Sequence, residues 1–339
     1  MLGLTLVDEA APADRRPVVV VGDVGLDVIA TMLGPFRQGS DTPSAVATHP
    51  GGAGANTAAW LAAYGMDVTV CGRVGDDAAG RAAVGELEAS GVRCAVALDA
   101  RLPTGLVVVV VDESGERSLF PARGANSALT EADCDLDVVV SAAGGRGAGR
   151  AACGRETAGL AAGPAAAGRE TEGPADGHLH VSGYVLLDEG SRAAGLAALA
   201  QARARGWTTS VDPQAASLVE RVGAAAFLEW VRGVDLLLPN EGELTALDGA
   251  TAALGSVRAV AVTAGPAGAR WVAEGVEVTV PAPAVDLVDP TGCGDAFDAG
   301  LLAAWLSGAD PESALRAGVA AGSRAATTPG ARPPAGPPF

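Results

Sequence analysis

Asp289-Pro-Thr-Gly-Cys-Gly-Asp295 is the most informative segment of the chain, and it leads into an apolar run from Ala296 to Leu306. The apolar residues of that run recur at helical spacing, which predicts a helix preceded by a glycine-rich turn. The backbone N–H groups of Gly292, Cys293 and Gly294, with the positive end of the helix dipole, then form a site for an anion. Asp295 lies at the mouth of this site, where it either caps the helix or takes a proton from a hydroxyl group that attacks phosphorus.

The amino-acid composition limits the size of the fold and the kinds of partner that the protein can have. The 339 residues suffice for one large α/β domain or two small ones, and 49% are apolar but only 4% aromatic, so Val, Leu and Ala build the core. A formal charge of −17 argues against a nucleic-acid partner. The five cysteines show no Cys-x-x-Cys pair, which favours a reduced, cytoplasmic setting. No apolar run is long enough to cross a membrane, so no membrane partner is expected.

The N-terminal half alternates strands with helices, which predicts an α/β fold with a mainly parallel sheet. Asp27 follows the first predicted strand, 18–21, at the end where open α/β sheets place ligand-binding groups. Further on, Gly51-Gly-Ala-Gly-Ala-Asn56 is a glycine-rich turn that opens an Ala-rich helix. It is not a dinucleotide-binding fingerprint, because the glycine spacing is wrong and the turn does not directly follow that strand.

Two further motifs follow predicted strands in the C-terminal half. Asn240 and Glu243 stand three residues apart at the start of a helix, so they share a face. They are either a capping pair or a site for Mg²⁺, which takes oxygen ligands, often through water. The segment Thr263-Ala-Gly265-Pro-Ala-Gly268 is either a plain hairpin turn or a turn beside a ligand.

These motifs together resemble the PfkB (ribokinase-like) family of carbohydrate and nucleoside kinases. Its signatures read roughly Gly-Gly-x-x-x-Asn, Asn-x-x-Glu and Asp-Thr-x-Gly-Ala-Gly-Asp, in that order. The resemblance implies one kinase domain over 18–331, with a three-layer α/β/α core and a small β-sheet lid from about 28–50 and 102–124. Residues 141–177 are a low-complexity insertion predicted to be disordered, and 1–17 and 332–339 are predicted to be loose termini.

By the same resemblance, the chain is an ATP-dependent kinase for a primary hydroxyl of a small sugar, with Asp295 as general base and the Gly292–Gly294 amides as anion hole. Mg²⁺ is placed through Glu243, and K⁺ is a further candidate cofactor at Asp289 and Thr291. The implied acceptor-binding residues are Asp27, Gly51, Gly52 and Asn56, and the implied ATP-binding residues are Asn240, Thr263, Gly265 and Gly268.

Several alternatives stay open at this point. The acceptor is either a sugar or a nucleoside of the adenosine or pseudouridine type, and Ala53, where ribokinases tend to carry Lys, disfavours ribose. A non-catalytic sugar- or nucleotide-binding module on the same fold is a further alternative. A phosphosugar kinase needs basic residues near the acceptor, for which Arg37 and Arg123 are the nearest candidates. The resemblance is also compatible with a homodimer formed through the lid.

Overall fold

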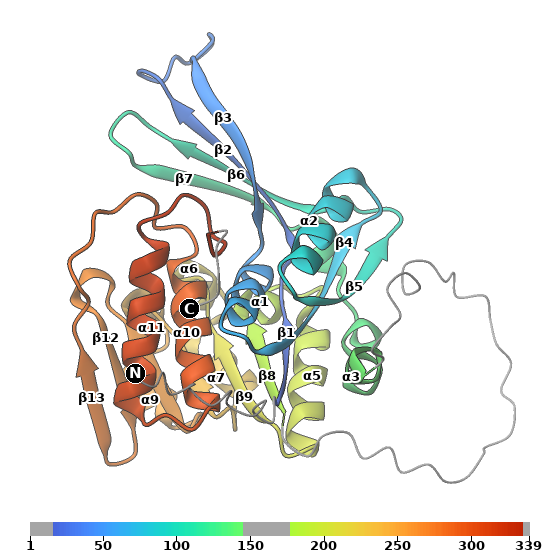
Figure 1. Ribbon diagram of the computed structural model, residues 1–339, viewed down its shortest axis with the longest axis vertical. Helices are drawn as coiled ribbons and strands as arrows, with labels where there is room; N and C mark the ends of the chain where they lie inside the picture. The colour runs from blue at the N-terminus through green and yellow to red at the C-terminus, as the bar shows by residue number, and fades with distance from the viewer. Residues whose placement is uncertain (1–15, 145–176, 335–339) are drawn as a thin grey trace, which may run out of the picture.

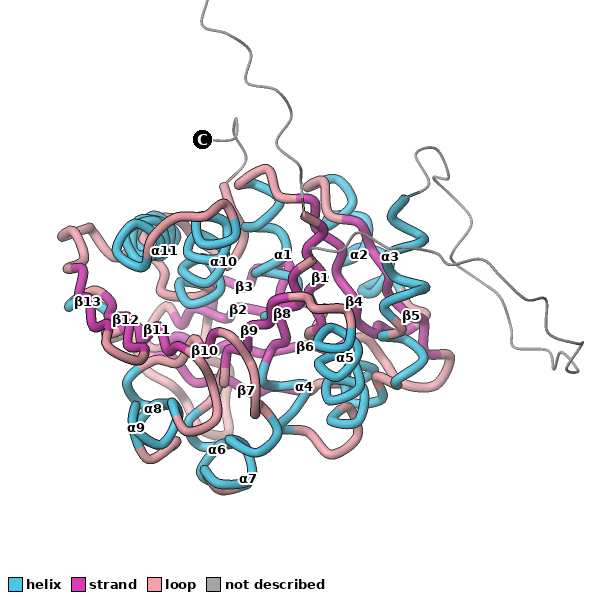
Figure 2. The backbone as a smooth tube through the Cα atoms, turned by 90° about the horizontal axis from the view of Figure 1, so that it is seen from below, coloured by secondary structure: helices cyan, strands magenta, loops and turns pink. Residues whose placement is uncertain are grey.

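The computed structural model describes residues 16–144 and 177–334, arranged as a sheet covered by helices on both faces, with a second, smaller sheet projecting from it (Figures 1 and 2). The main sheet has nine strands in the order β13-β12-β11-β10-β9-β8-β1-β4-β5. Strands β11 to β5 run parallel, and β12 and β13 add an antiparallel edge, which confirms the predicted mainly parallel sheet. The strands are β1 (Pro17–Val21), β4 (Asp67–Gly75), β5 (Arg93–Asp99), β8 (His178–Ser182), β9 (Thr208–Asp212), β10 (Leu236–Leu237), β11 (Ala259–Thr263), β12 (Ala269–Ala273) and β13 (Val276–Val280).

Two hydrophobic cores lie on the two faces of the main sheet. Because side chains alternate along a strand, Val18 and Val20 of β1 enter one core while Val19 and Val21 enter the other. The first core is covered by α1 (Ala53–Ala63), α2 (Ala78–Ala89), α10 (Cys293–Leu306) and α11 (Pro311–Ala325). The second is covered by α3 (Leu136–Gly144), α4 (Gly183–Leu187), α5 (Arg192–Ala204), α6 (Ala216–Val222), α7 (Ala224–Trp230), α8 (Glu241–Ala246) and α9 (Gly249–Leu254).

One predicted strand is shorter in the structure. The apolar pattern predicts a strand over 178–187, but β8 ends at Ser182 and residues 183–187 form α4. The change occurs at Gly183, where a Cβ atom would lie 2.5 Å from the carbonyl oxygens of Asp212 and Pro213. This close approach lets the chain leave the sheet and turn into a helix, which an apolar run alone does not reveal.

The second sheet has the order β3-β2-β6-β7 and is formed from the two segments predicted for the lid. Its two antiparallel hairpins, β2–β3 and β6–β7, meet along the parallel pair β2–β6. It projects beyond the carboxyl end of β1, on the side of the main sheet where α10 begins (Figure 1). The strands are β2 (Gly25–Met32), β3 (Ser44–Gly51), β6 (Gly105–Val111) and β7 (Arg117–Ala122).

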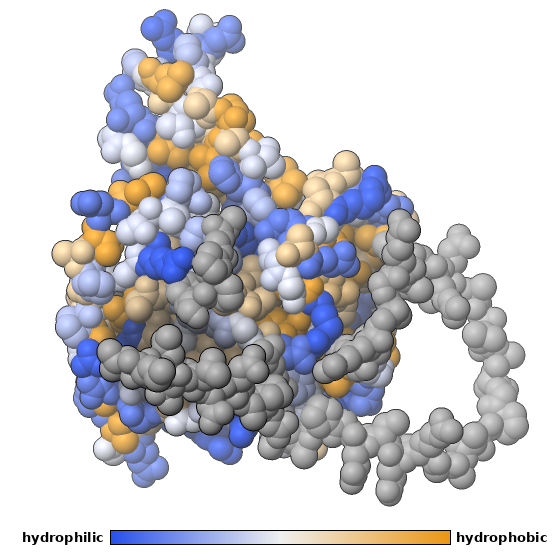
Figure 3. All heavy atoms as spheres, viewed as in Figure 1, coloured by the Kyte–Doolittle hydropathy of each residue, from blue (hydrophilic) through white to orange (hydrophobic). Residues whose placement is uncertain are grey.

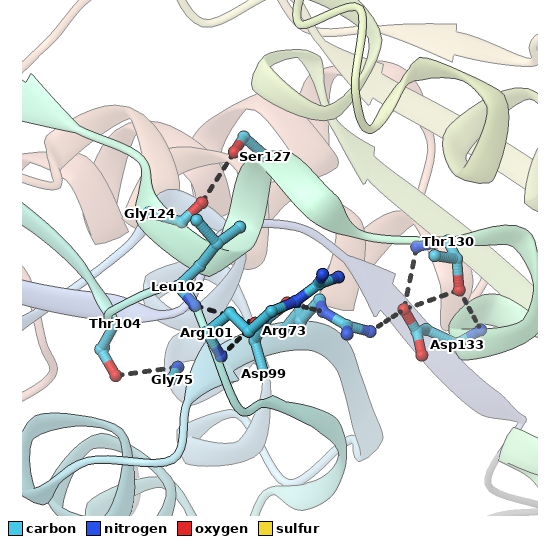
Figure 4. Close-up of polar contacts among 10 residues, drawn as sticks. All are labelled: Arg73, Gly75, Asp99, Arg101, Leu102, Thr104, Gly124, Ser127, Thr130 and Asp133. Atoms are coloured by element: carbon cyan, nitrogen blue, oxygen red, sulfur yellow. Dashed lines mark hydrogen bonds and ion pairs between the residues drawn. The ribbon is translucent and has the colours of Figure 1, made fainter. Parts of the chain in front are cut away.

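A polar network fixes the place where β5 leads into β6 (Figure 4). The Asp99 carboxylate accepts bonds from the backbone N–H groups of Arg101 and Leu102, at 2.8 and 2.9 Å, and from Arg73 Nε at 3.0 Å. Arg73 also pairs with Asp133, which precedes α3 in η2 (Glu131–Cys134). These bonds therefore hold the connection between β5 and β6, where the second sheet joins the core, in a fixed position. Two other short 3₁₀ helices, η1 (Gly124–Ala128) and η3 (Gly265–Ala267), complete the described elements.

Three of the sequence predictions fall mostly outside the described residues. They are the insertion at 141–177, apart from its ends, the N-terminal leader 1–17, and the C-terminal tail 332–339, of which the structure describes 332–334. Within 16–144 and 177–334, no helix combines the length and the apolar character that crossing a membrane requires.

Candidate active site

α10 begins after a glycine-rich turn, as the sequence predicts, but the set of free backbone N–H groups at its start differs from the predicted one. Gly292 adopts φ 74°, and a Cβ there would lie 2.6 Å from Ala331, so the turn needs glycine for both conformation and space. The Cys293 N–H donates to the Pro290 carbonyl at 3.3 Å, whereas the N–H groups of Gly294 and Asp295 have no acceptor among the described residues. The predicted anion hole is thus open at Gly294, and the Asp295 amide adds a donor that the sequence analysis did not name.

Asp295 itself is buried, with 8% of its surface exposed. Its Oδ2 accepts a hydrogen bond of 2.8 Å from Asn56 Nδ2, although the two residues are 239 positions apart. Burial raises the pKa of the Asp295 carboxyl to about 6, and the bonds from Asn56 and Gln214 only partly oppose this rise. A carboxylate of this basicity is a better proton acceptor than an exposed one and is still ionised at neutral pH.

The residues predicted to hold the acceptor do meet at one place. Asp27 is also buried, and burial raises its pKa to about 6. A Cβ at Gly51 would lie 2.4 Å from Asp27 Oδ1, and a Cβ at Gly52, with φ 91°, would lie 2.4 Å from the Asp23 carbonyl oxygen. Asn56 Oδ1 is buried and unpartnered among the described residues. It is therefore an acceptor available to a hydroxyl group of a ligand.

A polar cavity of about 190 Å³ lies on the other side of Asp295. Its lining includes the carboxylates of Asp212, Glu243, Asp295 and Asp298, and no Lys or Arg. Burial, followed by repulsion from neighbouring carboxylates, raises the pKa of both Asp212 and Asp298 well above the usual range. This concentration of buried acid groups is suited to a cation, and Mg²⁺ accompanied by phosphate oxygens fits the donor set.

Asn240 and Glu243 fulfil the capping role that the sequence left open, and they lie at the cavity where the other predicted role, a Mg²⁺ site, would be. They form a capping box at the start of α8, with Glu243 Oε2 accepting from the Asn240 backbone N–H at 2.9 Å and Oε1 from its side chain at 2.6 Å. Both side chains also line the polar cavity. Within the described residues, no three His, Cys, Asp or Glu side chains are arranged as direct ligands of one ion.

A larger, mainly apolar cavity of about 600 Å³ adjoins the polar one, and Thr263 and Gly294 line both. The predicted turn residues Gly265 and Gly268 also contribute to its wall. Gly268 has φ 104°, and a Cβ there would clash with the Val280 carbonyl oxygen, so this turn also requires glycine. The rest of the lining comes from the loop before α10 and from the facing sides of α10 and α11: Pro266, Ala282, Pro283, Ala284, Val285, Leu287, Pro290, Cys293, Phe297, Val319, Gly322, Ser323 and Ala326.

Asp289 and Thr291, predicted for a monovalent cation, already have a cationic neighbour. Arg117 of β7 donates to Asp289 Oδ1 at 2.7 Å and also contacts the Thr291 hydroxyl. Asp289 further accepts from the Thr291 and Gly330 N–H groups. Although burial opposes ionisation, these bonds hold the pKa of Asp289 below its usual value. A K⁺ ion at this carboxylate has to share it with Arg117.

Sequence reasoning missed several residues of the site. Asp298 lies one helical turn beyond Asp295, so its position in α10 was a usable signal, and Asp212 ends β9 at the edge where ligand groups gather.

Arg123, considered earlier for a substrate phosphate, is paired with Asp23, Asp188 and Ser191. Arg332, beyond the predicted end of the domain, lies near the acceptor residues instead, and nothing in its local sequence reveals this.

Comparison with known proteins identifies the family to which the chain belongs. The model of the pfkB carbohydrate kinase family matches residues 15–143 and 174–336. An ATP-dependent ribose-1-phosphate kinase from Halopiger xanaduensis is 31% identical over 288 residues, covering 83% of this chain and 82% of the relative. Fructokinase-2 from Oryza sativa subsp. japonica is 26% identical over 308 residues, covering 86% and 81%.

Solved structures share the fold over nearly the whole chain. An adenosine kinase from Sinorhizobium meliloti superposes with a TM-score of 0.75 at 24% identity, covering 94% of this chain and 96% of its own. A putative ribokinase II from E. coli in complex with ATP and Mg²⁺ gives 0.70 at 22% identity, with 94% of each chain covered. The chain therefore belongs to the pfkB family and is an ATP-binding carbohydrate kinase, a phosphotransferase with a hydroxyl acceptor.

Proposed function

We propose that the chain transfers the γ-phosphoryl group of ATP to a primary hydroxyl of a small sugar, with Asp295 as the general base. The observation that carries this proposal is the position of Asp295. Its buried carboxylate is bonded to Asn56 of the acceptor site and also lines the polar cavity beside the open amides of α10. A hydroxyl held by Asp27 and Asn56 would thus lie beside its proton acceptor, which also lines the cavity where a phosphate would bind.

The steps follow from these contacts. Asp27 and Asn56 Oδ1 accept hydrogen bonds from hydroxyl groups of the sugar and orient the attacking one. Asp295 takes its proton as the bond to phosphorus forms. The amides of Gly294 and Asp295 stabilise the charge that develops on the phosphoryl oxygens, and these donors are already oriented in the folded protein. The Gly292 turn keeps them in that direction.

The two cavities suit the two ends of ATP. The apolar cavity, with Gly265 and Gly268 in its wall, takes the base and ribose, and the polar cavity takes the phosphates. Asp212, Asn240, Glu243 and Asp298 are the residues that would hold Mg²⁺ there, which when bound neutralises phosphate charge. A cytoplasmic setting is part of the proposal, because the five cysteines of the sequence include no Cys-x-x-Cys pair.

Asp295→Asn is the test of this proposal. The amide keeps the size of the side chain but does not accept the proton, so we expect kcat to fall roughly 100- to 10,000-fold. Binding of ATP and the thermal unfolding temperature should stay close to those of the parent protein. The measurement is ADP release from Mg-ATP over a panel of sugars and nucleosides. Near-normal turnover in this variant contradicts the assignment of the base.

A further inference from the structure

Arg332 is a nearly buried guanidinium near the proposed acceptor site, and within the described residues its hydrogen bonds are largely unmade. Its side chain is 9% exposed, and Nε and Nη1 have no hydrogen-bond partner among the described residues. Arg73, Arg117 and Arg123, with 17–22% exposure, each bond at least two side chains instead. Leaving N–H donors buried and unpaired is unfavourable, so a fully structural role does not account for Arg332.

The contacts that Arg332 does make are long. Nη1 lies 3.4 Å from Glu86 Oε2, without the geometry of a hydrogen bond, and Nη2 lies 3.4 Å from the Gly51 carbonyl oxygen. The backbone beside it is firmly placed, because Trp60 Nε1 donates to the Ala331 carbonyl at 3.0 Å and the Gly330 N–H donates to Asp289 at 2.9 Å. The guanidinium is therefore held in position while its donors remain available.

Arg332 lies next to the residues proposed to hold the acceptor. Gly51, which it contacts, packs directly on the Asp27 carboxylate. Burial raises the pKa of Asp27 and of Asp295, and for both carboxyls the charge of Arg332 opposes that rise, which requires the guanidinium to be near. His49 acts on Asp27 in the same direction. A permanently charged guanidinium thus lies near Asp27 in a protein whose formal charge is −17.

We propose that Arg332 binds a phosphate group on the acceptor, so that the substrate of this kinase is a phosphorylated small sugar rather than a free one. The inference rests on the proposed function and extends it. A guanidinium presents its N–H donors in a fork that matches phosphate oxygens, and it supplies the charge that an anion needs in this acidic site. The relative from Halopiger xanaduensis, by its name, acts on ribose 1-phosphate, a substrate of this class.

The reaction then balances as follows. A free hydroxyl of the sugar phosphate loses its proton to Asp295, and its oxygen forms a bond to the γ-phosphorus of ATP. The bond from that phosphorus to the oxygen bridging to the β-phosphate breaks, and ADP leaves with the electron pair. The products are a sugar bisphosphate and ADP. The phosphate held by Arg332 takes no part in bond making and fixes which hydroxyl faces Asp295.

Calorimetric binding of ribose 1-phosphate and of ribose, without ATP, tests the inference independently of turnover. The parent protein should prefer the phosphorylated sugar. Arg332→Gln should weaken binding of ribose 1-phosphate roughly 10- to 100-fold and leave that of ribose unchanged, since it removes the charged donors alone. Arg332→Lys should recover part of the loss, because a lysine restores the charge but not the fork. Arg316→Gln, on the exposed face of α11, is the control.

Glu86→Gln distinguishes phosphate binding from a purely structural ion pair. If Arg332 serves the acceptor, removal of the competing carboxylate should strengthen ribose 1-phosphate binding a few-fold. A lower unfolding temperature with no gain in binding would instead assign Arg332 to the pair with Glu86 and overturn the inference.

Steady-state rates with both sugars separate the two proposals. Turnover of free sugar alone, lost in Asp295→Asn and unaffected by Arg332→Gln, would retain the kinase mechanism and overturn the phosphate assignment. Turnover that persists in Asp295→Asn, with ribose 1-phosphate binding still dependent on Arg332, would overturn the base and retain the assignment.

Discussion

Asp295 combines burial of its carboxylate with a hydrogen bond that fixes the orientation of that carboxylate. It is buried, which raises its pKa to about 6, and it remains bonded to Asn56, which fixes its orientation. Both come from its place in the first turn of α10, where the surrounding protein excludes water but the amides keep the site polar. An exposed carboxylate near its reference pKa of about 4 is a weaker base.

The pKa of Asp295 predicts the pH dependence of the reaction. The unprotonated carboxylate is the active form, so kcat/KM should be constant above about pH 7 and fall as the pH drops through about 6. Asp27, whose pKa is also raised to about 6, should add to the fall because it binds hydroxyl groups in its ionised form. Rates between pH 5 and 8 with the parent protein and Asp27→Asn check this. A flat profile in both contradicts it.

Among the elements, α8 carries one pair of side chains that caps the helix and is also proposed to take part in binding Mg²⁺. Asn240 and Glu243 close the capping box and also face the cavity that suits Mg²⁺ and phosphate. The spacing of three residues was sufficient to predict their shared face, but it did not decide between the two roles, because both need oxygen atoms at the start of the helix.

Glu243→Gln separates these roles. Glutamine at this position still supports a capping box, so we expect the free energy of unfolding to change by less than about 1 kcal/mol. The lost charge should raise the Mg²⁺ concentration for half-maximal rate roughly tenfold. Chemical denaturation and a Mg²⁺ titration of the rate measure the two effects. An unchanged Mg²⁺ requirement would restrict Glu243 to capping.

The elements also show what sequence can and cannot predict. Gly292 and Gly268 could be foreseen because the backbone itself requires glycine there. The hairpin β6–β7 could be foreseen from the turn composition of 112–116, which separates the segments Val107–Val111 and Arg117–Phe120. Arg332 could not be foreseen, because its environment depends on the path of the chain after α11, across Trp60 and towards α2. A side chain whose partners are distant in the sequence leaves no recognisable pattern in the residues on either side of it.

At the scale of the whole molecule, the second sheet leaves several large apolar side chains exposed on a single chain. Its strands β3 and β7 lie at its edges, and Val46, Leu119 and Phe120 are 65%, 61% and 58% exposed. Figure 3 shows apolar side chains over this projecting part. Leu119 and Phe120 are neighbours, so they point to opposite faces of the sheet. We propose that one face covers the acceptor and the other packs on a second copy of the chain.

Leu119→Ser with Phe120→Ser tests this dimer. The double variant should sediment as a monomer at concentrations where the parent protein is a dimer, since it removes apolar contact from both faces. Arg316→Gln, on α11, should leave the sedimentation unchanged. A parent protein that is monomeric at all concentrations contradicts the proposal.

The hydrogen bond between Asn56 and Asp295 has a consequence for how the protein is made. At about 5–20 residues per second, roughly 10 to 50 s separate the emergence of these two residues from the ribosome, since 239 positions lie between them. During that interval the nascent chain carries the residues proposed to bind the acceptor without the proposed base and anion hole. On the proposed mechanism it does not consume ATP before its C-terminal segment, with Gly330 and Ala331 docked on Asp289 and Trp60, has folded against the rest.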